Sequence, residues 1–445
     1  MRLFAVAALA ASFLGSAAFA QAPAQPALKV TYIQAGALLA VPGEAPRGAT
    51  TIIVRGNKIA ELRDGFVAPE AGASLVDLRN QFVLPGLIDM HVHFYSSGYP
   101  LQARLTFANK DKADQFVDAE LNARKTLDAG FTTVRDLGGD PRGIRALRDA
   151  IARGDVEGPT IVNAGEMISV TAGHGDANGL REDFAHAERA DTTAICNGAD
   201  DCRRATRDQI FMGAEVIKFA ASGGVGSNIA GGLEAQMTYD EMKAIVDTAH
   251  AFGRKATAHA HGKSGIDTAL RAGVDSIEHG SYIDDETVAL FRKTGAYLVP
   301  TRLAFENVIR QGRAGERPRA SVEKAEQVAL VVSESHKRAV KGGVKIAFGT
   351  DSGVGPHGIN AQEFALMTQV GMTPAAAIRA ATVDAATLLG RADRLGSIAP
   401  GKDADIIAVS ASPLEDVRRL EHVGFVMHQG VVHKIGDKRL PFPAE

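Results

Sequence analysis

The sequence has 445 residues, which suits one large domain with an accessory domain or several smaller domains. Hydrophobic residues make up 45% of the chain and charged residues 23%, which is typical of a soluble globular protein. The net charge of -3 gives no reason to expect nucleic acid, and no apolar run after the N-terminus is long enough to span a bilayer. We therefore expect neither a nucleic-acid partner nor a membrane partner.

The first twenty residues predict a cleavable signal peptide. Arg2 provides a basic start, an apolar run follows, and Ala18-Phe19-Ala20 forms a small-residue cleavage site before Gln21. A membrane anchor is the alternative, but the apolar stretch is short and ends in small residues. We expect a signal peptide at residues 1–20 and export to a periplasm or to the extracellular space.

Short alternating segments at both ends of the mature chain predict strands. Residues 28–84 include TTIIVRGNKIAEL and SLVDLRNQFVL, and residues 395–440 include VGFVMHQGVVHKIG. Apolar and polar residues alternate between glycines in these segments, which favours antiparallel pairing. We expect both ends to form one small, discontinuous β-sandwich domain, with residues 85–394 inserted between them as a unit.

The inserted residues repeat an apolar β-rich run, a loop and an amphipathic helix. One such helix should begin at the capping box Thr238-Tyr-Asp-Glu241 and end near Phe252, before Gly253. The candidate strands are LIDMHVH, TTVRD, TIVNAG, VIKFA, KATAHA, SIEHG, YLVPT and KIAFGTD. Alternating strand and helix units predict the α/β class, and eight of them predict a closed (β/α)8 TIM-like barrel.

The only two cysteines, Cys196 and Cys202, lie in the glycine- and aspartate-rich segment ICNGADDC. In an oxidising compartment they can close a small disulfide that staples the loop. Two free thiols are the alternative, and the spacing does not match a zinc-binding pair.

Residues that can bind a metal fall at or near the ends of five candidate strands. They are His91, His93, Lys218, His259, His279 and Asp351. His91 and His93 share one face of their strand because side chains alternate, and strand ends carry the reactive groups of such barrels. Individually, a strand lysine can be an ion-pair partner, an aspartate an N-cap and a histidine a packing residue. Six together predict a metal site, because imidazoles and anionic oxygens bind zinc and similar ions.

Lys218 needs a chemical explanation, because a protonated lysine is a poor metal ligand. A neutral amine that reacts with carbon dioxide becomes a carbamate, which is an anion with two oxygens. Such a group can bridge two cations about 3.5–4 Å apart. If Lys218 is modified in this way, the cofactors are two divalent ions, with zinc favoured, and N6-carboxylysine at Lys218.

The motifs PGLIDMHVH, GFTTVRD, AHAHG, SIEHG, GTDSG and LGSIAPGKDADIIAV occur in this order, with the strand lysine among them. In this the sequence resembles the metal-dependent amidohydrolase superfamily over nearly the whole mature chain. TAGHGD, and AHAHG followed by GIDTALRAGVDSIEHG, resemble its imidazolonepropionase-like branch, which includes Xaa-Pro dipeptidases and amidases that hydrolyse ochratoxin A. The resemblance implies that His91, His93 and Asp351 hold one metal, that His259 and His279 hold the other, and that carboxylated Lys218 bridges them.

Catalysis is assigned to Asp351 and His261, and substrate binding to seven other residues. Asp351 should accept a proton from the attacking water and pass it to the leaving nitrogen. His261 shares the face of His259 and either supports the metal site or polarises the substrate, unless it is a packed interior histidine. The expected substrate-binding residues are His174, Gly223, Gly224, Val225, Tyr95, Arg302 and His357. We expect His186, His250, His336, His422, His428 and His433 to be surface or packing residues.

The expected substrate is a small amide with a free carboxylate on the leaving amino acid. Xaa-Pro and acyl-phenylalanine compounds fit this description, and ochratoxin A is an example of the second type. Alternatives are a lactone or cyclic-amide hydrolase or a deaminase with the same metals, or a non-catalytic exported metal-binding protein. Related barrels often form dimers to octamers, so we also expect a homo-oligomer.

Overall fold

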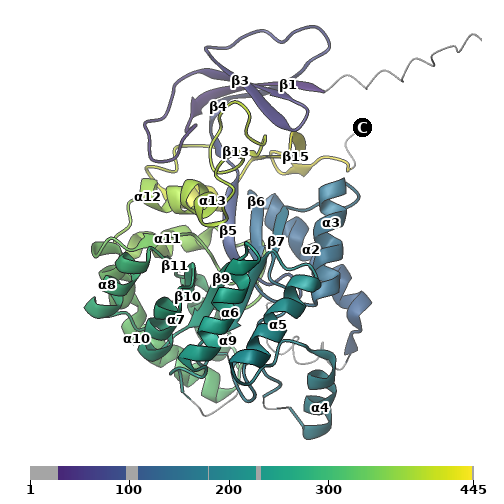
Figure 1. Cartoon of the computed structure of the whole chain (residues 1–445). Helices are drawn as coiled ribbons and strands as arrows, with labels where there is room; N and C mark the ends of the chain where they lie inside the picture. The colour runs from purple at the N-terminus through teal and green to yellow at the C-terminus, as the bar shows by residue number, and fades with distance from the viewer. Residues whose placement is uncertain (1–28, 97–108, 179, 227–231, 443–445) are drawn as a thin grey trace, which may run out of the picture.

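The computed structural model describes residues 29–96, 109–178, 180–226 and 232–442. The predicted signal peptide lies outside the described residues. Figure 1 shows a small β-rich domain at one end of a larger domain of strands and helices. Within the described ranges, the helices all lack the length or the apolar character needed to cross a membrane.

The small domain contains strands from both ends of the chain. In sheet order they are β16 (Lys438–Arg439), β15 (Val431–Ile435), β14 (Phe425–His428), β13 (Ile406–Val409), β4 (Ser74–Pro85), β1 (Val30–Leu38), β2 (Thr50–Arg55) and β3 (Lys58–Asp64). Neighbours are antiparallel except β1 and β4, which run parallel. A sandwich has two sheets, whereas these strands form one sheet, because β4 and β13 pair directly and join the two ends. Side chains of both ends share one core, including Ile33, Ile52 and Phe425.

The larger domain contains the eight predicted parallel strands. They are β5 (Leu87–Val92), β6 (Phe131–Asp136), β7 (Thr160–Asn163), β8 (Val216–Ala220), β9 (Lys255–Ala260), β10 (Ser276–His279), β11 (Tyr297–Val299) and β12 (Lys345–Ile346). They form a three-stranded and a five-stranded sheet, and every pairing is parallel.

Backbone contacts join the two parallel sheets at both of their edges. After β12, Asp351 N donates to His91 O at 2.7 Å, and Val92 bridges Ser352. At the other edge, Ile168 bridges Phe219 of β8, after the end of β7. Strands that are neighbours in the sequence are therefore neighbours in space throughout the larger domain.

Helices follow most of the parallel strands. They are α2 (Lys112–Asp128), α3 (Pro141–Arg153), α4 (Glu182–Asp191), α5 (Ala199–Phe211), α6 (Tyr239–Ala251), α7 (Lys263–Ala272), α8 (Asp285–Thr294), α9 (Arg302–Arg313), α10 (Arg319–Lys341), α11 (Gln362–Gln369), α12 (Pro374–Arg379) and α13 (Ala385–Leu388). A π-helical turn, η1 (Ala380–Asp384), joins the last two, and η2 (Val417–Glu421) is a 3-10 helix in the C-terminal segment. The predicted capping box before α6 is present, because Glu241 N donates to the Thr238 hydroxyl and Thr238 N donates to the Glu241 carboxylate.

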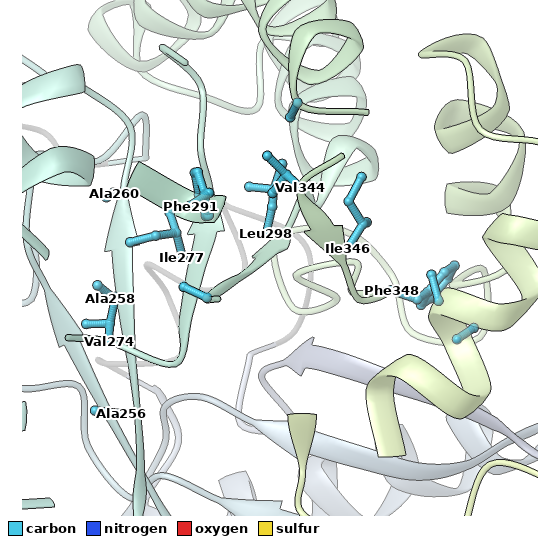
Figure 2. Close-up of a cluster of buried hydrophobic side chains, with 14 of the residues drawn as sticks. Ala256, Ala258, Ala260, Val274, Ile277, Phe291, Leu298, Val344, Ile346 and Phe348 are labelled. Atoms are coloured by element: carbon cyan, nitrogen blue, oxygen red, sulfur yellow. The ribbon is translucent and has the colours of Figure 1, made fainter. Parts of the chain in front are cut away.

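Alternation along the strands separates an apolar face from a polar one. In β9, Ala256, Ala258 and Ala260 belong to the hydrophobic core, whereas Thr257 and His259 point to the opposite side. Figure 2 shows these alanines near Ile277 of β10 and Leu298 of β11. The polar side chains of the strands are therefore left facing one another inside the larger domain.

The small domain lies where the parallel strands begin. Its strand β4 leads through Gly86 directly into β5, and Gly86 N donates to Asp405 O beside β13 at 2.9 Å. Figure 1 shows the rest of the larger domain extending away from this junction. The opposite rim, where the parallel strands end, is left for the functional site.

Candidate metal centre

A cavity of about 210 Å³ lies where the parallel strands end. All six predicted metal ligands line it, from β5, β8, β9, β10 and the segment after β12: His91, His93, Lys218, His259, His279 and Asp351. The six residues therefore lie together at one rim, as expected from the sequence.

His91 and His93 project from the end of β5, with their Nε2 atoms 3.2 Å apart. His91 Nδ1 lies 2.9 Å from the Glu278 carboxylate, and His93 Nδ1 lies 2.9 Å from the Gly138 carbonyl. The His93 contact is a hydrogen bond, and the His91 contact is a close ion-pair approach without hydrogen-bond geometry. A nitrogen that faces a carbonyl or a carboxylate oxygen is favoured in its protonated form, so each neutral ring carries its proton on Nδ1. Both Nε2 atoms then face the same part of the cavity. Two imidazole nitrogens at this separation can bind one metal ion together, so this geometry fits a metal site.

Glu278 is buried and orients the His91 ring. Arg135 donates to its Oε1 at 2.6 Å, and the Ser276 hydroxyl donates to the same atom at 2.9 Å. Burial raises the pKa of Glu278, but the neighbouring Arg135, His91 and Lys218 outweigh this and hold the pKa well below its usual range. An ionised carboxylate on Nδ1 fixes the ring orientation and makes Nε2 a stronger metal ligand.

Lys218 lies in the middle of β8, and only 2% of its surface is exposed. Its Nζ is 3.3 Å from His91 Nε2. Burial lowers the Lys218 pKa to about 8, although Glu278 and Asp351 act in the opposite direction. A lowered pKa increases the fraction of neutral amine near neutral pH, which is the form that reacts with carbon dioxide. Position and pKa therefore both fit the predicted carbamate.

His259, His261 and His279 form a cluster in which one possible ligand atom from each lies within 4.8 Å of the others. The buried His259 Nε2 has no hydrogen-bond partner in the described structure. His279 Nδ1 lies 2.7 Å from the Thr301 hydroxyl, which itself donates to a backbone carbonyl. The neutral His279 ring therefore donates through Nδ1 and keeps its Nε2 lone pair for the cavity.

The backbone is strained at two of the predicted ligands. Strict alternation would place His279 on the same side as Ile277, which packs in the hydrophobic core. Instead His279 has φ +72° and its ring reaches the other histidines of the cavity. Asp351 also lies in the left-handed region, with φ +56°. Such conformations cost roughly 1–3 kcal/mol each and cluster at functional sites.

Asp351 forms a second group of possible metal ligands with His91 and His279. One ligand atom from each of the three residues lies within 4.8 Å of the others. Its Oδ1 lies 3.3 Å from His93 Nε2 and 3.5 Å from His91 Nε2. Burial raises the pKa of Asp351, but His91, His93 and Lys218 outweigh it and lower the pKa to about 2. The side chain is therefore an ionised acceptor beside both imidazoles.

Three of the other predicted site residues line the cavity: His174, Val225 and His261. The His174 ring stacks on His259 with centroids 4.1 Å apart. His261 Nδ1 lies 2.7 Å from the Ser281 hydroxyl, and its ring faces His279 at 4.7 Å. His261 is thus a cavity residue, and the structure does not place it among the packed interior histidines.

The remaining predicted substrate-binding residues are absent from the described cavity lining: Gly223, Gly224, Tyr95, Arg302 and His357. A side chain at Gly224 would collide with the His174 ring, so this glycine provides space for His174. Tyr95 packs against Gly139 and Gly143 near the start of α3.

Arg302 and His357 are held by other buried groups. Arg302 donates to Ser333 at 3.0 Å and lies 3.5 Å from the His336 ring. His357 lies 3.2 Å from the backbone carbonyl of His93 and packs against Phe94. Both therefore support the framework of the cavity and do not form its wall.

The six histidines expected outside the site divide into two groups. His186, His250 and His422 are exposed. His336 is buried, with Nε2 2.8 Å from the His279 carbonyl, and His428 and His433 are buried beside Asp405 and Glu157. None of the six lines the described cavity.

Several residues of the site were not predicted from the sequence. Glu278 and Arg135 lie within the SIEHG and TTVRD runs, and their positions on the inner faces of two strands were a signal that could have identified them. Phe305, Val308 and Arg317 line the cavity from α9 and the segment after it. Nothing in their local sequence separates them from ordinary helix and loop residues.

Comparison with known proteins agrees with this site. The amidohydrolase family model matches residues 82–435. An ochratoxinase from Aspergillus niger is 34% identical over 428 residues, which cover 90% of this chain and 85% of that protein. The crystal structure of a Xaa-Pro dipeptidase with methionine in its active site is 38% identical and superposes with a TM-score of 0.85, over 91% of this chain and 100% of the other.

A further structure, of a prolidase in complex with N-methylphosphonate-L-proline, has a TM-score of 0.82 and 32% identity, over 92% of this chain and 100% of the other. Family match, sequence relatives and structural neighbours thus agree over most of both chains. The chain therefore belongs to the amidohydrolase family, in the branch with ochratoxinase and the Xaa-Pro dipeptidases, and is a hydrolase of amide or peptide C–N bonds.

Proposed function

We propose that the chain is a binuclear metal-dependent amidohydrolase that cleaves the amide bond of a small N-acyl amino acid or dipeptide with a free carboxylate. The observation that carries the proposal is the convergence of His91 Nε2, His93 Nε2 and the Asp351 carboxylate, with the two nitrogens 3.2 Å apart and Lys218 Nζ 3.3 Å from one of them. Two imidazole nitrogens and a carboxylate oxygen at these distances match the ligands of a divalent ion. We infer further that the two parallel sheets act as one closed (β/α)8 barrel, because hydrogen bonds connect both pairs of edges.

The donors fit two ions, with zinc favoured by the number of imidazoles. His91, His93 and Asp351 would hold one ion, His259 and His279 the other, and carboxylated Lys218 would lie between them. Divalent ions bound here supply Lewis acidity and lower the pKa of a water to near neutrality.

The side chains of the chain itself do the proton transfer and the positioning. Asp351 Oδ accepts the proton of the attacking water and returns it to the leaving nitrogen. His261, anchored through Nδ1 on Ser281, presents its other nitrogen to the substrate carbonyl. The apolar wall formed by Phe305 and Val308 excludes bulk water and strengthens these polar contacts.

The relatives support the substrate class. An ochratoxinase, a Xaa-Pro dipeptidase and a prolidase are all among the similar proteins. We therefore propose a substrate of the Xaa-Pro or acyl-phenylalanine type, with ochratoxin A as an example of the second.

Metal removal tests this function directly. The purified protein is screened against N-acyl amino acids, dipeptides and ochratoxin A before and after dialysis with a zinc chelator. We expect amide cleavage to be lost with the metal and to return when Zn²⁺ is added, because the site has no other strong electrophile. Metal content is measured in parallel. Full activity in metal-free protein would contradict the proposal.

The same screen separates the alternatives. Lactones, cyclic amides and amino-substituted heterocycles are included, and ammonia release is recorded. Cleavage confined to those compounds would indicate a lactonase, a cyclic-amide hydrolase or a deaminase. Stoichiometric metal binding with no turnover on any compound would indicate a non-catalytic metal-binding protein.

We also propose that the chain is exported. The disulfide between Cys196 and Cys202 supports this, because such bonds persist in oxidising compartments. When the full-length protein is expressed in a bacterium, we expect it in the periplasmic or extracellular fraction, with an N-terminus at Gln21. Recovery of the uncleaved chain from the cytoplasm with both thiols reduced would refute export.

A further inference from the structure

We infer that Arg317, together with Lys324, binds the C-terminal carboxylate of the substrate and so makes the enzyme selective for a free acid at that end. The inference rests on the proposed function and assigns two residues to the recognition of the free carboxylate of the substrate. Neither residue is one of the proposed metal ligands, and neither is adjacent in sequence to one of them.

The cavity lining offers few positive side chains outside the predicted metal site. Apart from Lys218 and the histidines, Arg317 is the one basic side chain among the described residues that line the cavity. The neighbouring wall is apolar and includes Val225, Phe305 and Val308. A substrate anion that enters this space loses its hydration and needs a positive partner there, since an unpaired buried charge is costly.

Hydrogen bonds to residues of the cavity wall fix the position of Arg317. Arg317 Nε donates to Gln311 Oε1 at 2.8 Å. Gln311 in turn donates from Nε2 to the carbonyl of Val354 at 3.0 Å, and Val354 also lines the cavity. The guanidinium is therefore tied both to α9 and to the loop that follows Asp351. A planar guanidinium matches the two oxygens of a carboxylate better than any other side chain does.

Lys324 adds a second positive charge near the same wall. Its Nζ donates to the Gly224 carbonyl at 3.0 Å, and Ser321, one turn earlier on α10, donates to the Val225 carbonyl at 3.0 Å. Burial lowers the His174 pKa to about 4, and the positive charges of Lys218 and Lys324 contribute to this shift. This ammonium thus acts on the cavity histidines, and α10 is tied to the segment that carries Val225.

Together these contacts define a substrate class. The scissile amide lies among the histidines, an apolar side chain contacts Phe305 and Val308, and the carboxylate faces Arg317 with Lys324 nearby. The preferred substrates are therefore N-acyl or N-aminoacyl derivatives of apolar amino acids with a free C-terminal acid.

The test compares Arg317→Met with the wild type on a matched substrate pair. One compound is the best substrate of the screen above, and the other is its analogue with hydrogen in place of the carboxylate. For an acyl-phenylalanine these are N-acetyl-L-phenylalanine and N-acetyl-2-phenylethylamine. We expect kcat/KM for the acid to fall about 10- to 100-fold, mostly through KM, as for the loss of a charge-assisted hydrogen bond. The value for the analogue should not change.

Further variants control for damage to the fold. Arg313→Met changes an exposed arginine on α9 and should leave both substrates unaffected. Lys324→Met should weaken acid binding less than Arg317→Met, and Arg317→Lys should recover part of the selectivity. If the analogue is cleaved too slowly to follow, its inhibition constant against the acid replaces kcat/KM.

The outcomes separate this inference from the proposed function. Equal losses on both compounds, or no loss on the acid, would overturn the role of Arg317. Equal cleavage of acid and analogue by the wild type would also overturn it, while leaving amide hydrolysis intact. If the zinc-loaded wild type cleaves no amide, the proposed function itself fails.

Discussion

Replacing Lys218 with alanine is expected to remove the bound metal and the amide hydrolysis together. The Lys218 Nζ lies in the same cavity as the other proposed ligands, 3.3 Å from His91 Nε2. Alanine has no atom that reaches this point, so neither an amine nor a carbamate can lie between two ions. We expect turnover to fall by at least about 10³-fold, because metal ions supply several kcal/mol of transition-state stabilisation. Metal content by mass spectrometry and kcat are measured on the same preparations.

Two comparisons distinguish a missing bridge from a damaged fold. Acetate or formate can supply two carboxylate oxygens to the space that alanine leaves, so we expect partial recovery of metal and activity with them and none with chloride. Metal-free wild type should also regain more activity with Zn²⁺ and bicarbonate than with Zn²⁺ in buffer free of carbon dioxide. A Lys218→Ala enzyme with normal metal content would show that the bridging role is wrong.

Asp351→Asn is expected to separate metal binding from catalysis. Asparagine has nearly the same shape and keeps one oxygen, while His91 and His93 remain in place, so most of the metal should stay bound. The amide cannot accept a proton from water, so kcat should fall by about 10²- to 10⁴-fold, the usual contribution of a general base. Binding of the substrate should change little, and KM and metal content are the measurements that show this.

The matched control is Asp437→Asn, which changes an exposed aspartate next to β16 in the small domain. This variant should match the wild type in kcat, KM and metal content. If Asp351→Asn retained normal turnover with its metal, proton transfer would have to be assigned to another residue, and His261, which also lines the cavity, would be tested next. Loss of metal together with activity would instead make Asp351 chiefly a ligand.

The disagreements about the site concern residues in the segments that follow the parallel strands. Tyr95 follows the proposed ligand His93 by only two residues, yet it packs against Gly139 and Gly143 at the start of α3. Arg302 begins a helix at the rim, yet its side chain extends to Ser333 on α10. Loop direction depends on which neighbouring element offers a packing or hydrogen-bonding partner, and these partners are distant in sequence.

The sequence by itself determined the strands, the capping box at Thr238 and the residues at the strand ends, whereas the disulfide between Cys196 and Cys202 was one of two alternatives until the structure showed it. These features depend on local rules, because alternation selects the face of each side chain and parallel strands bring their C-terminal ends to one rim. The six proposed ligands, from His91 to Asp351, could be identified in this way before any contact was known.

Only the tertiary structure decided how those side chains are held and what surrounds them. The buried pair of Arg135 and Glu278 orients His91 from two other strands, and the left-handed backbone of His279 turns its ring into the cavity. Arg317 and Phe305 reach the same space from α9 and beyond. Contacts between residues so far apart in the chain arise from packing, and no local pattern in the sequence encodes them.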